Sequence, residues 1–235
     1  CGVVDDTGDE IFADKVGVML ARDMSALHKD AKFVVDVKST GLFITDPVLI
    51  ANGVKADYWK TGHSYMKRRV NETGALAGFE KSGHFFFNPP IGRGYDDGLI
   101  SALAVCDMLD RNPGKKLSEL KNALPKTWQS PTMAPHCADE IKYGVVEKVV
   151  KHFENAKLKD NKVAGQPIRD LVTVNGVRVT VEDGTWGLVR ASSNKPELVV
   201  VVESPVSEQR MRDMFKAVDD VLRQNPEVGK YNQTI

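Results

Sequence analysis

The segment Glu80-Lys81-Ser82-Gly83-His84 holds a set of side chains suited to binding a polyhydroxylated ligand. If the segment is extended, Glu80, Ser82 and His84 lie on one face, because side chains alternate along a strand. A carboxylate can accept hydrogen bonds from two adjacent hydroxyls, whereas serine and histidine both donate and accept. The pattern therefore predicts a site for sugar hydroxyls. A polar edge strand or an exposed loop is the alternative that the spacing leaves open.

A second set, Arg190-Ala191-Ser192-Ser193-Asn194, separates two apolar runs and is suited to binding an anion. The guanidinium of Arg190 is a planar fork that fits phosphate oxygens. Ser192, Ser193 and Asn194, with the backbone N–H groups of a turn, can complete a cradle. A phosphate carries roughly −1.5 to −2 charges at neutral pH, so one arginine with neutral donors is a sensible minimum. A simple hairpin turn rich in serine and asparagine is the alternative.

Lys38 and His63 are the candidates for proton transfer. Lys38 follows the apolar run 33–37, and His63 comes directly after a glycine in Lys60-Thr61-Gly62-His63-Ser64. Open α/β sheets place ligand contacts at such strand ends and turns, and both side chains can move a proton or neutralise an anion. The basic run 67–69 is interpreted as a solvated helix face, and a structural hydrogen bond is the alternative role for His63.

The first half of the chain has the pattern of an α/β unit that could position these residues. Apolar residues recur at helical spacing from 13 to 27, which predicts a helix that begins near Asp14. The run 33–37 predicts a strand covered on both faces. Recurrent glycines between 58 and 87 favour loops and short strands over long helices. Asp96-Asp97-Gly98 offers an N-cap for an amphipathic helix that follows it.

The second half has the pattern of a smaller α+β unit. Prolines between Arg111 and Pro135 predict a linker, and a helix begins around Ala138. The turns that follow separate four short strands of an antiparallel meander, at 171–174, 177–181, 187–190 and 198–202. A helix over 211–222 should pack on one face of that sheet. The predicted fold is an α/β domain with a mixed sheet, followed by a smaller α+β domain with an antiparallel sheet and packed helices.

Composition excludes several classes of function. The 235 residues are 42% hydrophobic and 27% charged, which is typical of a folded protein of two modest domains. Basic and acidic residues number 32 each, so the net charge is zero. The chain therefore has no overall positive charge that would attract a nucleic acid or an anionic membrane. The three cysteines, Cys1, Cys106 and Cys137, are far apart, which argues against a disulfide scaffold or a zinc site and favours the cytoplasm. No P-loop, dinucleotide-binding or serine-hydrolase motif is present.

Taken in order along the chain, these motifs resemble the α-D-phosphohexomutase family, in particular its bacterial phosphomannomutase/phosphoglucomutase branch. The resemblance covers nearly the whole chain and rests on the segments 36–38, 60–64, 80–84, 96–98 and 187–192. It implies that residues 1–12 end the family's second domain, that 13–125 form its sugar-binding α/β domain three, and that 136–235 form its C-terminal phosphate-binding domain four.

Cys1-Gly2-Val3-Val4 reads as the end of a buried strand. In the family, Gly-Val-Val follows an Asp-Gly-Asp-Gly-Asp-Arg magnesium loop, so the resemblance implies a chain that starts after the metal ligands and lacks the phosphoserine. The missing N-terminal domains are then expected partners. Mg²⁺ and a hexose 1,6-bisphosphate activator are expected in the full-length enzyme, with no metal or other cofactor on residues of this chain.

The resemblance implies an isomerase that interconverts the 1- and 6-phosphates of mannose, glucose or both through a bisphosphorylated sugar. Sugar hydroxyls would contact Glu80, Ser82 and His84, and Lys38 and His63 would serve as acid or base near the reacting oxygen. The phosphate that is not transferred would contact Arg190, Ser192, Ser193 and Asn194. The isolated chain is expected to be inactive.

Two departures from the family pattern bear on these roles. Phe79 stands where the family usually has glycine before the glutamate. The phosphate loop of the family commonly reads Arg-x-Ser-Asn-Thr-x-Pro, whereas here Ser193, Asn194 and Lys195 occupy the positions after Ser192. The phosphate-binding role that the family implies is therefore assigned more firmly to Arg190 and Ser192 than to the residues after them. A phosphosugar-binding module without catalysis is the alternative for this chain. A glucosamine-specific relative is disfavoured by the match around Lys60–Ser64.

Overall fold

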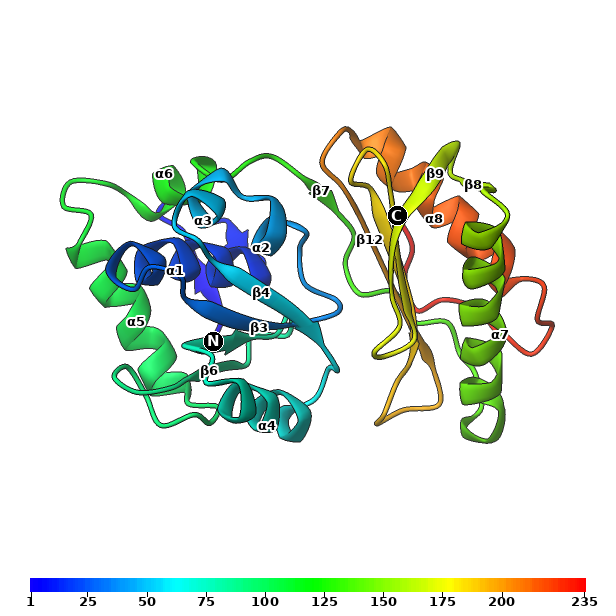
Figure 1. Ribbon diagram of the computed structural model, residues 1–235, viewed down its shortest axis with the longest axis horizontal. Helices are drawn as coiled ribbons and strands as arrows, with labels where there is room; N and C mark the ends of the chain where they lie inside the picture. The colour runs from blue at the N-terminus through cyan, green and yellow to red at the C-terminus, as the bar shows by residue number, and fades with distance from the viewer. The chain divides into compact units, whose positions relative to one another are not determined.

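The computed structural model describes residues 1–235, and the chain divides into two compact units, residues 1–126 and 127–235 (Figure 1). Each unit has its own sheet and its own hydrophobic core. None of the helices in either unit is long and apolar enough to cross a membrane.

The first unit is built around a four-stranded sheet. Its elements are β1 (Val3–Val4), β2 (Glu10–Ile11), α1 (Ala13–Leu27), β3 (Lys32–Asp36), α2 (Leu42–Thr45), α3 (Pro47–Ala51), β4 (Lys55–Trp59), α4 (His63–Thr73), β5 (Ala77–Phe79), β6 (Phe85–Phe87), α5 (Gly98–Asp110) and α6 (Leu117–Asn122). The strand order is β4-β3-β5-β6. Because β3 is parallel to β4 and β5 whereas β6 is antiparallel to β5, the sheet is mixed, as predicted. The three parallel strands end at one edge.

Helices cover both faces of this sheet. Phe33 and Val35 of β3 belong to the core formed with α1 and α5, whereas Val34 belongs to the small core under α4. A strand covered on both faces is apolar at successive positions, which is why the run 33–35 is continuous. A Cβ on Gly78 would lie 2.6 Å from Val70 Cγ2, so glycine allows α4 to pack this closely on β5.

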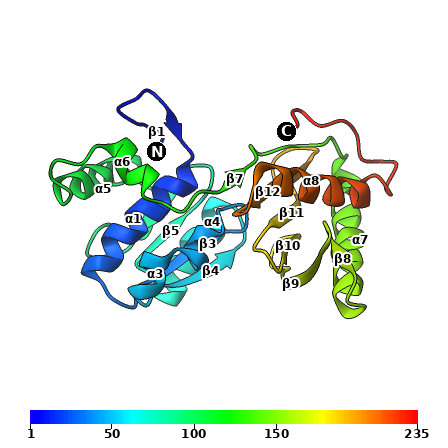
Figure 2. The same ribbon diagram turned by 90° about the horizontal axis from the view of Figure 1, so that it is seen from above.

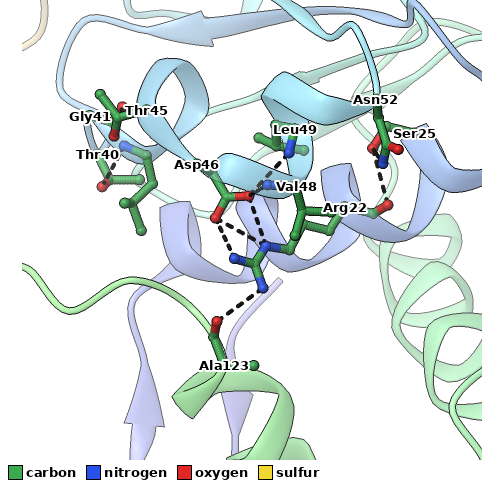
Figure 3. A network of polar contacts seen from close by, with 11 residues as sticks. Arg22, Ser25, Thr40, Gly41, Thr45, Asp46, Val48, Leu49, Asn52 and Ala123 are labelled. Carbon is green, nitrogen blue, oxygen red and sulfur yellow. Dashed lines mark hydrogen bonds and ion pairs between the residues drawn. The ribbon is translucent and has the colours of Figure 1, made fainter.

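Arg22 joins three helices of the first unit (Figure 3). Its Nε lies 3.0 Å from both carboxylate oxygens of Asp46, and its Nη1 donates to the carbonyl of Ala123 at 3.1 Å. Asp46 is fully buried and also accepts the amide hydrogens of Val48 and Leu49, which caps α3. The guanidinium therefore ties α1 to the start of α3 and to the end of α6.

The second unit is a six-stranded antiparallel sheet with two helices on one face (Figures 1 and 2). Its elements are β7 (Trp128–Gln129), α7 (Asp139–Leu158), β8 (Lys162–Val163), β9 (Gln166–Val172), β10 (Val177–Val181), β11 (Trp186–Ala191), β12 (Leu198–Ser204) and α8 (Glu208–Leu222). The strand order is β7-β12-β11-β10-β9-β8. Alternate residues of β10, β11 and β12 pack against α7 and α8. The predicted meander and its packed helices are confirmed.

Two expectations from the sequence were wrong in detail. The interval 58–87 contains the eleven-residue helix α4, although the glycines favoured loops and short strands over long helices, and only the basic run 67–69 indicated a helix. Only Met66 and Val70 of α4 are buried, so its apolar pattern is too sparse to predict a helix. Val3 and Val4 form a two-residue strand that pairs with β2, and Val4 is 61% exposed, so they do not end a buried strand.

Candidate functional site

The carboxyl edge of the first sheet gathers one group of the predicted site residues. Lys38 follows β3, His63 begins α4 shortly after β4, and Glu80–His84 connects β5 to β6. Parallel strands that end side by side bring the turns after them together, and ligands of open α/β sheets bind at that edge. The group consists of Lys38, His63, Glu80, Ser82 and His84.

Asp36, the last residue of β3, connects the turns at this edge. Its carboxylate is fully buried and accepts hydrogen bonds from Ser39 Oγ at 2.6 Å and from Thr61 Oγ1 at 3.1 Å. The amide of Lys81 donates to Asp36 Oδ1 at 3.3 Å. Lys38 Nζ lies 3.4 Å from Asp36 Oδ2, and both side chains are at least nine-tenths buried. The proposed proton carrier Lys38 is therefore held by an ion pair.

The segment Glu80–His84 is a hairpin loop, which corrects the expectation of an extended strand. The amide of Glu80 donates to the carbonyl of His84 at 3.0 Å, and the amide of Gly83 donates to the carbonyl of Glu80 at 2.9 Å. Gly83 has φ of +88°, a conformation that favours glycine. Strand alternation therefore does not apply to the segment: Glu80 is buried, whereas Ser82 and His84 are exposed.

Glu80 nevertheless remains in contact with two parts of the site. Its Oε1 accepts a hydrogen bond from the amide of Gly62 at 2.9 Å, and its Oε2 accepts one from Ser82 Oγ at 3.0 Å. Glu80 is only 3% exposed, and these two protein donors compensate for the burial of its carboxylate. Glu80 thus links the hairpin loop to the turn that precedes His63.

The two histidines of this edge have different surroundings. His84 is about half exposed and its Nδ1 lies 2.6 Å from Asp96 Oδ2. His63 is exposed, and its ring centroid lies 5.5 Å from that of Phe86 on β6. Further along α4, Lys67 and Arg68 are exposed, as the interpretation of a solvated helix face predicted. The structure thus fixes the orientation of His84 more firmly than that of His63.

The second group of predicted residues lies in the other unit, where β11 turns into β12. Arg190 is 7% exposed near the end of β11, and its Nη1 donates to the carbonyl of Ala191 at 2.8 Å. The Ser192 amide donates to the carbonyl of Glu197 at 3.0 Å, which closes the loop. Its side chain oxygen accepts from the Asn194 amide at 3.4 Å. Ser193 and Asn194 are exposed at the tip, in the turn geometry that the sequence predicted.

The residues of this chain do not fit a metal centre. No three His, Cys, Asp or Glu side chains are grouped so that they could hold a metal ion. A magnesium site needs several oxygen ligands around one point.

Sequence reasoning did not assign a role to Asp36, Thr61 or Asp96. Asp36 ends the apolar run 33–36, and a carboxylate at the carboxyl end of a buried strand is a signal that points to this edge. Thr61 lies in the predicted segment 60–64 and Asp96 in the segment 96–98, but nothing in either local pattern identifies their hydrogen-bond partners. Thr61 contacts Asp36, which is 25 positions away, and Asp96 contacts His84, which is 12 positions away.

The first unit is an α/β domain with a buried polar network at the carboxyl ends of its parallel strands, the edge at which open α/β sheets bind ligands, and an antiparallel α+β unit follows it. Residues 12–128 match the family model for phosphoglucomutase/phosphomannomutase alpha/beta/alpha domain III, and residues 140–221 match the model for the C-terminal domain of the same family. The chain belongs to the phosphoglucomutase/phosphomannomutase family, and it corresponds to the C-terminal portion.

Relatives and solved structures agree with this assignment. The chain is 31% identical to the phosphomannomutase/phosphoglucomutase of Pseudomonas putida, over 97% of this chain and 46% of that protein. It is 33% identical to the phosphoglucomutase of Neisseria meningitidis serogroup A, over 96% and 45% respectively. A phosphoglucomutase/phosphomannomutase family protein from Burkholderia thailandensis gives a TM-score of 0.79 at 27% identity, covering 99% of this chain and 46% of that one. The chain thus spans about half the length of the relatives it matches.

Proposed function

We propose that this chain supplies the sugar- and phosphate-binding part of a cytoplasmic phosphohexomutase, which interconverts the 1- and 6-phosphates of glucose, mannose or both. The observation that carries the proposal is the network in which Asp36 and Glu80 hold three turns together at one sheet edge. The names of the relatives support the substrate class.

Sugar hydroxyls are assigned to the hairpin loop of the first unit. Each oxygen of the Glu80 carboxylate takes one protein donor, and a carboxylate oxygen has two acceptor sites, so each retains one for a ligand hydroxyl. Ser82 and His84 are exposed beside it and can both donate and accept. A carboxylate flanked by these groups suits a ring with neighbouring hydroxyls, in either of two orientations.

The phosphate that is not transferred is assigned to the turn between β11 and β12. Arg190 supplies the positive charge, and charge-assisted hydrogen bonds to phosphate are about twice as strong as neutral ones. Ser192, Ser193 and Asn194 supply hydroxyl, amide and backbone donors around it. Both groups of residues would bind and orient the phosphosugar, and phosphoryl transfer is catalysed mostly by positioning and charge stabilisation.

The reaction consists of two transfers with opposite directions. First, a sugar hydroxyl oxygen forms a bond to a phosphorus atom, the bond from that phosphorus to the donor breaks, and the hydroxyl proton leaves. Then the other phosphoryl group returns to the donor, and its sugar oxygen regains a proton. We assign these proton movements to Lys38 and His63. The phosphoryl donor, Mg²⁺ and the bisphosphate activator are assigned to the preceding domains and to the full-length enzyme.

Calorimetric titration of the 235-residue chain tests the binding part of this proposal. Glucose 1-phosphate and mannose 1-phosphate are compared with free glucose and with inorganic phosphate at one salt concentration. We expect saturable binding of a phosphosugar, with a higher affinity than that for free glucose or for inorganic phosphate. Equal affinity for phosphosugar and inorganic phosphate would contradict the assignment of a sugar site to this chain.

A phosphosugar-binding module without catalysis would give the same titration. The two are separated by an assay of the complete gene product for conversion of glucose 1-phosphate to glucose 6-phosphate. Turnover supports the mutase, whereas binding without turnover supports the module.

A further inference from the structure

The Asp36 carboxylate is the most heavily shared acceptor at the carboxyl edge of the first sheet. It lies at the end of the central strand β3 and is fully buried. Its donors come from the turn after β3, the turn after β4 and the loop after β5, namely Ser39 Oγ, Thr61 Oγ1 and the amide of Lys81, together with the Lys38 ammonium. One side chain therefore contacts all three segments that carry the predicted site residues of the first unit, both those for sugar hydroxyls and those for proton transfer.

The donors of Asp36 are next to the partners of Glu80 in the sequence. Thr61, which donates to Asp36, precedes Gly62, which donates to Glu80. Lys81, whose amide donates to Asp36, directly follows Glu80. Asp36 and Glu80 thus form two parallel connections between the turn before α4 and the hairpin loop. If the first connection is lost, the hydrogen bond between Gly62 and Glu80 still joins the turn to the loop.

Replacement of one oxygen is enough to disturb this arrangement. A buried carboxylate is tolerated only when hydrogen bonds satisfy it, and the bonds that it accepts are stronger than neutral ones. Asparagine has nearly the same size, but its amide nitrogen donates and cannot accept. Ser39 and Thr61 can reverse their hydroxyls, but the Lys81 amide and the Lys38 ammonium can only donate. These two groups contact different oxygens of Asp36, so in asparagine one of them would face another donor.

We propose that Asp36 is a positioning residue of the sugar site, which acts through Lys38, Thr61 and Lys81 and does not touch the ligand. The identity of the ligand rests on the function proposed above. The positioning itself does not, because it concerns only contacts within the first unit.

Amide hydrogen exchange of the 235-residue chain measures the positioning directly. In Asp36→Asn we expect the amides of Lys81 and Gly62 to exchange at least about tenfold faster. The Lys81 amide loses its charged acceptor, and Gly62 loses the charged anchor of its neighbour Thr61. The amides of 33–35 in β3 should keep their protection. Gly62 is the decisive reporter, because Asp36 does not contact it and a faster exchange there means that the hydrogen bond between Gly62 and Glu80 has loosened.

Asp46→Asn is the matched control, since Asp46 is an equally buried carboxylate of the same unit that contacts neither turn. It should lower stability without a selective effect at Gly62. Thr61→Val removes one connection while keeping the side chain's shape, and it replaces Asp36→Asn as the test if that variant does not fold. Unchanged exchange at Gly62 in both Asp36→Asn and Thr61→Val, or the same acceleration in Asp46→Asn, would overturn the proposal.

Calorimetry of the same variants separates this inference from the proposed function. Asp36→Asn should bind glucose 1-phosphate at least about tenfold more weakly and inorganic phosphate with unchanged affinity. Undiminished affinity for glucose 1-phosphate in a variant with accelerated exchange would overturn the role in the sugar site. If the unmodified chain does not bind glucose 1-phosphate, the proposed function fails, and the exchange at Gly62 alone decides whether Asp36 positions the loop.

Discussion

The amide of Gly62 donates to Glu80 Oε1 at 2.9 Å, so the residue predicted to bind sugar also fixes the start of the helix that begins at His63. Gly62 is the N-cap of α4 and has φ of +128°. The amides at the start of a helix lack partners within the helix, and a carboxylate there is also favoured by the helix dipole. Loss of the Glu80 side chain's acceptor oxygens would therefore affect both the hairpin loop and the placement of His63.

Glu80→Gln separates the charge of Glu80 from its contacts. Glutamine keeps an oxygen that can accept from Gly62, and Ser82 can reverse its hydroxyl toward the new amide. We expect the loop to remain in place while phosphosugar affinity falls by about 1 kcal/mol, the difference between charged and neutral hydrogen bonds. Calorimetry with glucose 1-phosphate and inorganic phosphate measures the effect. Equal loss for both ligands would contradict a sugar role for Glu80.

Arg190→Ala should weaken phosphosugar binding by roughly 1.5 to 3 kcal/mol, the range for a hydrogen bond to a charged group. The buried guanidinium also donates to the carbonyl of Ala191, so a thermal unfolding curve must accompany the titration. Arg169→Ala, at an exposed position of β9 in the same sheet, is the matched control for the loss of a positive charge. Affinity that is unchanged in Arg190→Ala, or lowered equally in Arg169→Ala, would remove the phosphate assignment.

Sequence periodicity predicted those elements whose buried faces are rich in apolar residues. The helix over 13–27 and the strands within 177–202 have such faces, and each is found close to its predicted bounds. Apolar periodicity did not predict helix α4, because its only buried residues are Met66 and Val70, and only the basic run 67–69 indicated a helix there. Packing against Gly78 of β5, rather than an amphipathic pattern of its own, allows α4 to lie close to the sheet.

The types of residue at the site could be predicted from sequence, but their connections could not. Lys38 and His63 follow strands, which local patterns can reveal. The Lys81 amide, in contrast, meets Asp36 from 45 residues away, and that pairing depends on the order in which the strands assemble. The hairpin at Glu80–His84 was missed for a related reason, because the tight loop forms only where β5 and β6 pair in register.

His84 is oriented by Asp96, whose Oδ2 lies 2.6 Å from the Nδ1 of the ring. A carboxylate at that position favours a proton on Nδ1, which leaves Nε2 directed away from Asp96. We expect Asp96→Asn to change the tautomer population of His84, as read from the ¹⁵N chemical shifts of the ring. Phosphosugar affinity should fall by less than in His84→Ala, because the ring itself remains. An Asp96→Asn variant as weak as His84→Ala, with an unchanged ring spectrum, would contradict an orienting role.

Asp5 links the β1–β2 hairpin to α6 and makes the first unit sensitive to acid. Its Oδ2 accepts from the ammonium of Lys121, and its Oδ1 accepts from the amide of Thr7 at 2.9 Å and from that of Asp9 at 3.1 Å. The hydrogen bond from Lys121, followed by those from Thr7, holds the pKa of Asp5 below its usual value. The folded state therefore binds the proton more weakly than the unfolded state, whose aspartate pKa is about 3.9.

The stability that Asp5 contributes is consequently complete above its unfolded pKa and is lost as the pH falls through its lowered folded pKa. Urea unfolding of the chain and of Asp5→Asn should give a constant difference in unfolding free energy above about pH 5, and a difference that shrinks below about pH 4. Glu72→Gln, which removes an exposed carboxylate from α4, is the control and should leave this pH dependence as it is. A difference that grows as the pH falls would mean that the Asp5 carboxylate destabilises the hairpin instead of anchoring it.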